Sequence, residues 1–69
     1  MSEQISIVLN GESRLVAART LIDLVDELGL QQRMIAIERN LEVVPKSQYG
    51  STRIEDNDRI ELVHMIGGG

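Results

Sequence analysis

The chain has no cysteine, and Tyr49 is its only aromatic residue. Without thiols it can form no disulfide and no thiolate metal site. Its own side chains also cannot carry out thiol-based sulfur or redox chemistry. The core must therefore be aliphatic, and the 42% of hydrophobic residues is sufficient to build one. A chain of 69 residues forms one small domain of modest stability.

Basic residues are also few, because seven Lys and Arg stand against eleven Asp and Glu, for a net charge of −4. They are scattered, so we expect no nucleic acid partner, which would need clustered positive charge. An acidic protein is suited instead to a basic patch on a partner protein. Long apolar runs and a secretory signal pattern are both missing. We therefore expect no membrane partner and a cytoplasmic location.

Glycine, in contrast, gathers at the end of the sequence, where Gly67, Gly68 and Gly69 follow the apolar run 60–66. Glycine loses more backbone entropy on ordering than any other residue, so three together call for an explanation. A segment without side chains is thin and flexible enough to enter a narrow enzyme channel. Chain ends are also commonly frayed. The glycines alone leave both interpretations open.

Hydrophobic periodicity predicts a hairpin at the start of the chain. Residues 3–9 alternate between apolar and polar, as in a half-buried strand whose inward residues are Ile5, Ile7 and Leu9. Asn10 and Gly11 both tolerate positive φ and form the strongest short hairpin signal. We therefore expect 12–17 to return antiparallel to the first strand.

A short helix should follow. Thr20 is placed as its N-cap, with Asp23 able to complete a capping box. Gly29 is placed as the residue that ends the helix in a left-handed turn. The solvent side carries Asp23, Asp26 and Glu27, and the apolar stripe at helical spacing consists of Leu21, Leu24, Val25 and Leu28.

The second half predicts more strands, at 34–38, 43–44 and 59–65. Pro45 donates no backbone hydrogen bond, so the short middle strand ends there or lies at an edge. Residues between the second and third of these strands should be irregular, with one helical turn that places Tyr49 on the core. Helix and strands in this order predict an α+β fold, and the β-grasp (ubiquitin-like) architecture is the compact solution: a mixed sheet of four to five strands packed on one helix. Its domain would span 1–66, and 67–69 would be a flexible tail.

The last predicted strand has an outward face next to the glycines. By alternation, this face opposes the inward Ile60 and Leu62 and carries Arg59, Glu61, Val63 and Met65. Methionine adapts to irregular partner surfaces, so we interpret this face as a docking patch. The alternative is a few ordinary exposed apolar residues.

Other features of the sequence argue against an active site within the chain. His64 is the only histidine, and no neighbouring residue is suited to orient it for catalysis. The acidic segment 55–58 lacks the full spacing of a calcium loop, so we expect a solvated turn and no metal site. An independent enzyme is disfavoured, because no constellation of nucleophile, base and metal ligands is present.

The pattern as a whole resembles the ThiS family, the ubiquitin-like sulfur carriers of thiamine thiazole biosynthesis. The matching segments are 5–11, 20–25, 35–40, 44–49, 56–63 and 68–69. The block with Val44-Pro45 followed by Lys46 and Tyr49 is the most diagnostic internal segment. The resemblance implies a β-grasp sheet in which the last strand lies centrally and parallel to the first. Departures from the family pattern are Lys46 for Arg, Leu41 and Asn57 for Gly, and the additional Gly67.

The resemblance also implies a mechanism. An E1-like adenylyltransferase (ThiF type) would use ATP to activate the Gly69 carboxylate. A persulfide donor would then convert it to a thiocarboxylate, which thiazole synthase (ThiG type) would consume. Gly68 and Gly67 would fit the partner's channel. The chain would thus be a carrier and not an enzyme, a monomer on its own, with no catalytic residue, metal or permanently bound cofactor.

Three alternatives stay open from the sequence. A small subunit of molybdopterin synthase (MoaD type) would use the same tail chemistry with a pterin acceptor, although the 44–49 block and the short length favour the thiazole branch. A ubiquitin-like protein modifier would instead form an amide with a target lysine. The third alternative is an interaction domain with an inert tail.

Overall fold

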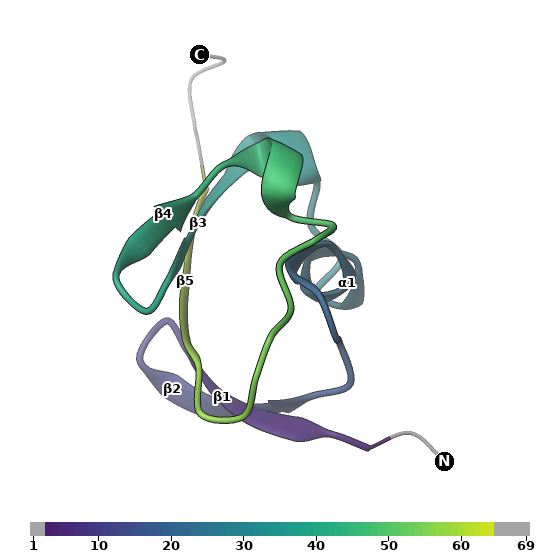
Figure 1. Cartoon of the computed structure of the whole chain (residues 1–69), viewed down its shortest axis with the longest axis vertical. Helices are drawn as coiled ribbons and strands as arrows, with labels where there is room; N and C mark the ends of the chain where they lie inside the picture. Colours follow the sequence, from purple (N-terminus) through teal and green to yellow (C-terminus); the bar gives the residue numbers. More distant parts are fainter. Residues whose placement is uncertain (1–2, 65–69) are drawn as a thin grey trace.

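The computed structural model describes residues 3–64, in which one α-helix lies across one face of a five-stranded mixed sheet (Figure 1). The strand order is β2-β1-β5-β3-β4, so the last strand lies in the middle of the sheet. The β-grasp prediction is therefore confirmed. In chain order the elements are β1 (Ile5–Leu9), β2 (Glu12–Val16), α1 (Leu21–Glu27), the 3-10 turn η1 (Gln32–Met34), β3 (Ile35–Arg39), β4 (Glu42–Val44), the 3-10 turn η2 (Lys46–Gln48) and β5 (Arg59–His64).

The two neighbours of β5 hold it to different extents. β1 runs parallel to β5, as expected for this fold, but pairs with it at only two positions, Val8 with Arg59 and Leu9 with Ile60. β3 runs antiparallel and pairs along five positions, up to Ile35 opposite His64. The C-terminal half of β5 is consequently held mainly from the β3 side.

Helix α1 has the two ends that the sequence predicts. The N–H of Asp23 donates to Thr20 Oγ1 (3.2 Å), and the N–H of Thr20 donates to Asp23 Oδ2 (3.3 Å), which closes a capping box. At the other end Gly29 has a φ of +72°, and the N–H of Leu30 donates to the carbonyl of Val25 (3.0 Å). A helix of seven residues depends on the sheet for its stability.

The core fills the space between α1 and the inner face of the sheet. Tyr49 follows η2 and is 1% exposed, so the predicted turn that places it on the core is confirmed. Burial raises the pKa of the Tyr49 hydroxyl, against a hydrogen bond with the Ile37 backbone that lowers it. The buried apolar residues are Ile7, Leu9, Val16, Ala18, Leu21, Leu24, Val25, Ile35, Ile37, Tyr49, Ile54 and Ile60.

The connection from β2 to α1 is fixed by one carboxylate of the helix. Glu27 lies on the exposed face of α1, as expected, but its Oε1 accepts the N–H groups of Ala17 (3.1 Å) and Ala18 (3.0 Å). These amides would otherwise need water as a partner. Glu27 therefore links the end of the helix to the segment that enters it.

The outer face of the sheet is left open within residues 3–64, because α1, η1 and η2 all lie on the other side or at its end (Figure 1). Of the described residues, three large apolar ones are exposed on this outer face by strand alternation: Leu15, Val43 and Val63. Two details differ from the sequence prediction. Met34 belongs to η1 and not to β3, and β4 begins at Glu42.

Candidate functional site

The candidate site is β5, the strand that leads toward the terminal glycines. Its faces alternate as predicted: Ile60 is buried, Leu62 is half-buried against the core, and Arg59, Glu61 and Val63 are exposed. Val63 is 58% exposed. The other residues predicted for the site, Met65, Gly67, Gly68 and Gly69, lie outside the described residues.

Asn10 clamps β5 from the β1 side. It ends β1 with a φ of +50°, and its N–H donates to the carbonyl of Ile60 (2.9 Å). Its side-chain Oδ1 accepts the N–H of Leu62 at 2.8 Å. In a parallel ladder a backbone carbonyl would occupy this position, but the chain has already turned away into Gly11. The side-chain amide of Asn10 thus extends the pairing of β5 beyond the end of β1.

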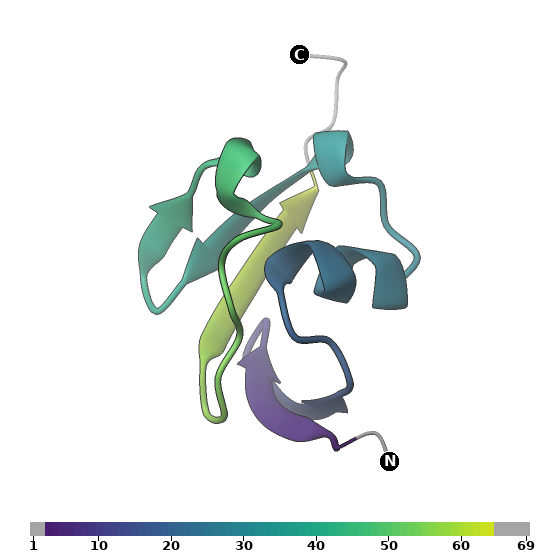
Figure 2. The same ribbon diagram turned by 45° about the vertical axis from the view of Figure 1, so that its right-hand side comes forward.

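Asn40 clamps β5 from the β3 side in the same manner. Its φ is +52°, its N–H donates to the carbonyl of Arg59 (2.7 Å), and its Oδ1 accepts the N–H of Arg59 (2.9 Å). The two hairpins therefore lie on opposite sides of β5 (Figure 2). Each uses one asparagine for both the turn and the clamp. From the sequence Asn10 is predicted as a turn residue only, and the clamp role of both side chains is not predicted.

The acidic segment 55–58 is not a simple solvated turn, and that expectation is wrong for Asp58, which is 7% exposed. Arg39 Nε donates to Asp58 Oδ2 (2.7 Å), Asn40 Nδ2 donates to Oδ1 (3.2 Å), and the N–H of Glu55 donates to Oδ2 (2.9 Å). Burial alone would raise the pKa of Asp58, but these donors and the Arg39 charge outweigh it and hold the pKa below its usual value. Asp58 thereby fixes the start of β5 to the end of β3.

The same acidic turn is tied to β1. Asp56 Oδ1 accepts the N–H of Ser6 (2.8 Å), and the N–H of Asn57 donates to the carbonyl of Ser6 (2.7 Å). Asn57 has a φ of +71°, which asparagine tolerates better than most residues. The turn before β5 is therefore attached to the strands on both of its sides.

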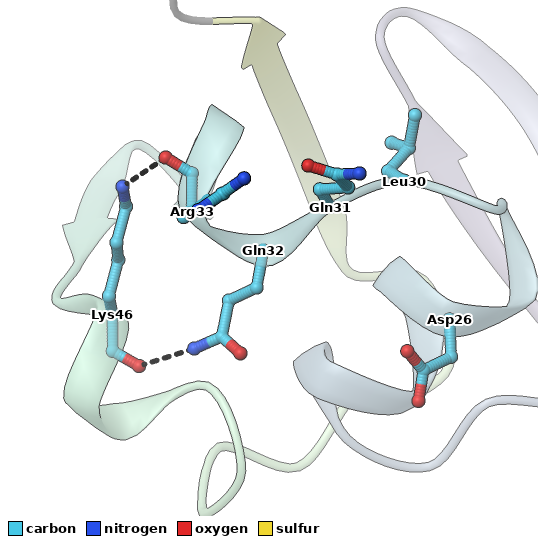
Figure 3. Close-up of a pocket in the computed structure, with 6 residues that line it drawn as sticks. All are labelled: Asp26, Leu30, Gln31, Gln32, Arg33 and Lys46. Atoms are coloured by element: carbon cyan, nitrogen blue, oxygen red, sulfur yellow. Dashed lines mark hydrogen bonds between the residues drawn. The ribbon is translucent and has the colours of Figure 1, made fainter. Parts of the chain in front are cut away.

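A shallow depression lies near the end of the sheet where β5 finishes (Figure 3). It opens between α1, η1 and η2. Two hydrogen bonds join the 3-10 turns across it, from Lys46 Nζ to the carbonyl of Arg33 (2.8 Å) and from Gln32 Nε2 to the carbonyl of Lys46 (3.4 Å). Lys46 thus joins η1 and η2. The six residues that line the depression include no nucleophile with an adjacent base: Asp26, Leu30, Gln31, Gln32, Arg33 and Lys46.

The described chain offers little for chemistry of its own. His64 is exposed at the end of β5, and within residues 3–64 its imidazole has no hydrogen-bond partner that would orient it. In the same range no group of three His, Cys, Asp or Glu side chains is placed to hold a metal ion. No helix in the described part of the chain is long and apolar enough to cross a membrane.

The sheet order and the central last strand define a ubiquitin-like β-grasp protein. Comparison with known proteins agrees. A crystal structure of the thiamine biosynthesis protein ThiS from Geobacter metallireducens superposes with a TM-score of 0.81 at 25% sequence identity, covering 94% of this chain and all of that one.

Sequence relatives are of two kinds. The sulfur carrier protein ThiS of Bacillus subtilis is 38% identical over 50 residues, covering 72% of this chain and 76% of the relative. A thiazole synthase of Paramagnetospirillum magneticum is 47% identical over 64 residues, covering 91% of this chain. The chain spans only about a fifth of that relative's length, since the match covers 20% of it. The ThiS family model matches residues 7–69, and the chain belongs to the ThiS family.

Proposed function

We propose that this chain is a sulfur carrier whose Gly69 carboxylate is converted to a thiocarboxylate and supplies sulfur for the thiazole of thiamine. The observation that carries the proposal is the match to the ThiS family from residue 7 to the final glycine. The likeness to a protein named sulfur carrier ThiS supports it. The domain proper would be 1–66, with 67–69 as the tail that enters the partners.

The chemistry would take place on partner enzymes. An E1-like adenylyltransferase of the ThiF type binds ATP, and the Gly69 carboxylate attacks the α-phosphorus with loss of pyrophosphate. The terminal sulfur of a persulfide donor then attacks the acyl carbon, and AMP leaves. A second thiol then attacks the donor's sulfur in the resulting acyl disulfide, which breaks the S–S bond, releases the thiocarboxylate and leaves a disulfide between that thiol and the donor. The chain supplies only the carboxylate, so it is a co-substrate and not an enzyme, a monomer with no cofactor or metal of its own.

The glycines suit this chemistry because a side chain would obstruct a narrow channel. Gly68 lies next to the reacting carboxyl, and Gly67 would lengthen the reach of the tail. The body would contribute a fixed origin for the tail, since β5 is clamped on both sides by Asn10 and Asn40.

Partner contact would use the outer face of β5, formed by Arg59, Glu61 and Val63, together with Met65, which comes after the described residues. Val63 contributes an exposed apolar surface there. We expect Val63→Asp to weaken binding to the adenylyltransferase more than it lowers the melting temperature. Leu15→Asp is the matched control, because Leu15 is equally apolar and 60% exposed but lies on β2, an edge strand. Equal weakening by both variants would contradict a localised docking patch.

Intact-mass measurement tests the proposed function. The protein is incubated with ATP, a persulfide donor, a reducing thiol and the adenylyltransferase, with a reaction lacking ATP as the control. We expect a mass gain equal to replacing one oxygen by sulfur, located at Gly69. Larger conjugates in place of this gain would indicate a protein modifier, and an unchanged mass would contradict the carrier proposal. Complementation of a thiazole-requiring strain, but not of one lacking molybdopterin, separates the two sulfur-transfer branches.

A further inference from the structure

Leu41 has an unusual combination of backbone conformation and exposure. It follows Asn40 in the β3–β4 turn with a φ of +73°, a region that L side chains other than those of asparagine and aspartate rarely occupy. Its side chain is 75% exposed, the highest value among the large apolar residues that the structure describes. Because Leu41 is mostly exposed, its side chain adds little to the stability of the fold. Its positive φ strains the backbone of the turn.

The β1–β2 turn provides an internal reference. Asn10 and Gly11 have φ values of +50° and +86°, close to the +52° and +73° of Asn40 and Leu41. Both turns clamp β5 through the asparagine, and glycine serves the second position in one of them. A leucine is consequently not needed to form such a turn. Strained residues that the fold does not require are a recognised sign of a functional contact.

The surroundings of Leu41 extend the apolar character of the hairpin. Val43 lies two residues further along and is 70% exposed, on the outer face of the sheet. Leu41, Asn40 and Arg59 together line a shallow cleft. Arg59 is also the first residue of the proposed docking face on β5, so the Leu41 tip is continuous with that face.

We propose that Leu41 is an anchor residue that inserts into an apolar pocket of the thiazole synthase partner. This inference rests on the proposed function. Thiazole synthase is favoured over the adenylyltransferase because two relatives named thiazole synthase contain a segment that matches 91% of this chain, so that in them the carrier-like part and the enzyme share one polypeptide. A surface adapted to that enzyme accounts for an apolar anchor that the isolated domain does not need.

The position of Leu41 assigns it a role in specificity and not in the chemistry. The turn lies beside the first residue of β5, whereas the glycines follow its last residue. β5 has six residues and is roughly 17 Å long. The anchor and the tail would therefore contact the partner at two separate places, and the anchor would orient the domain while the tail enters the active site.

Two substitutions remove the apolar side chain without harming the turn. Leu41→Gly and Leu41→Asn both suit a positive φ, and we expect neither to lower the melting temperature. Binding to thiazole synthase, measured by calorimetry, should weaken about tenfold in Kd, the effect of withdrawing most of a leucine from an apolar pocket. Leu41→Met keeps an apolar side chain and should bind as the wild type does. Leu15→Ser, which alters an exposed leucine on the edge strand β2, should also leave Kd unchanged.

Each other outcome overturns the anchor. If Kd for thiazole synthase is unchanged in Leu41→Gly and Leu41→Asn, the residue has no binding role. If the two variants slow adenylation and leave that Kd unchanged, the occupant is the adenylyltransferase. If Leu15→Ser weakens binding to thiazole synthase equally, the contact is nonspecific hydrophobic association and not an anchor at Leu41. The wild-type mass gain at Gly69 is measured separately, so failure of the anchor is distinguishable from failure of the sulfur-carrier function.

Discussion

The two hairpins that flank β5 (Figure 2) hold this strand by the same kind of asparagine contact, but their turns are completed by different residues. In each, an asparagine at positive φ donates its N–H to a β5 carbonyl and accepts a β5 N–H with its side chain. The β1–β2 hairpin completes its turn with the relaxed Gly11. The β3–β4 hairpin completes it with the strained and exposed Leu41, and it is reinforced by the ion pair between Arg39 and Asp58.

The two sides of β5 also differ in how strongly they hold this strand. The β1 side pairs at only two positions and extends its hold through one side chain, Asn10. The β3 side combines five paired positions with a buried carboxylate. The stronger side therefore tolerates a strained residue at its turn, and we infer that it uses this tolerance to present Leu41.

The largest effect should follow from removing the carboxylate of the stronger side. Asp58→Ala leaves Arg39 and the Glu55 N–H without their acceptor, and it should lower the free energy of unfolding by about 2–3 kcal/mol. Denaturant titration at neutral pH measures this change. A loss equal to that of an exposed acidic residue such as Asp26→Ala would contradict a structural role for Asp58.

Lowering the pH should remove the stability that Asp58 contributes on the same β3 side. Because the folded protein holds the pKa of Asp58 below its usual value, the ionised form contributes stability above the unfolded-state pKa, at about pH 4. That contribution is lost as the pH falls from there through the folded-state pKa. In Asp58→Asn this part of the acid dependence should disappear, and a wild-type-like decline below about pH 4 would contradict the assignment.

On the weaker β1 side, Asn10→Ala should lower the free energy of unfolding by about 1–2 kcal/mol. The variant loses the acceptor of the Leu62 N–H and places alanine at a positive φ. Amide hydrogen exchange at Leu62 should accelerate more than exchange at Glu61, which pairs with β3. Equal acceleration at both amides would mean that Asn10 acts on the whole fold and not as a local clamp.

Making the first turn resemble the second is a smaller perturbation. Gly11→Leu introduces a side chain at a φ of +86°, where a Cβ would meet no atom within 4 Å. The effect is then conformational only, and we expect a loss of about 1 kcal/mol. A larger loss with a changed β1–β2 register would show that the two turns are not equivalent.

The smallest change in the free energy of unfolding, and the only increase, should come from making the second turn resemble the first. Leu41→Gly relieves backbone strain but gives the unfolded chain more freedom, so the two terms nearly cancel and leave a gain of roughly 0–1 kcal/mol. Thermal unfolding beside the wild type measures it. A clear loss of stability would show that Leu41 belongs to the fold, and it would remove the basis for an anchor role.

Local patterns were sufficient to predict α1 and the five strands, although the bounds of β3 and β4 differ by one residue and η1 was not predicted. Alternation located β1 and β5, the spacing of four leucine and valine residues located α1, and Asn10-Gly11, Thr20 and Gly29 located its boundaries and the first turn. The central place of β5 was predicted from the resemblance, since periodicity reports which face of a strand is buried and not which strand is its neighbour.

The contacts that fix β5 could not be predicted in this way. Asp58 meets Arg39 across 19 residues of sequence, and Asn10 meets Leu62 across 52. An acidic run with a polar neighbour has the composition of a solvated turn, so its burial is visible only once the sheet is assembled. Leu41 was recognised in the sequence as a departure from glycine, but its exposure and strain required the structure.

In the proposed function the body holds β5 while Gly69, and no other glycine, carries the sulfur. This is tested by comparing the wild type with a chain that ends at Gly68 and with Gly68→Val, measuring both the melting temperature and the mass gained with ATP, persulfide donor, reducing thiol and adenylyltransferase. We expect unchanged melting temperatures and a sulfur gain in the wild type alone. An equal sulfur gain in the shortened chain would contradict it.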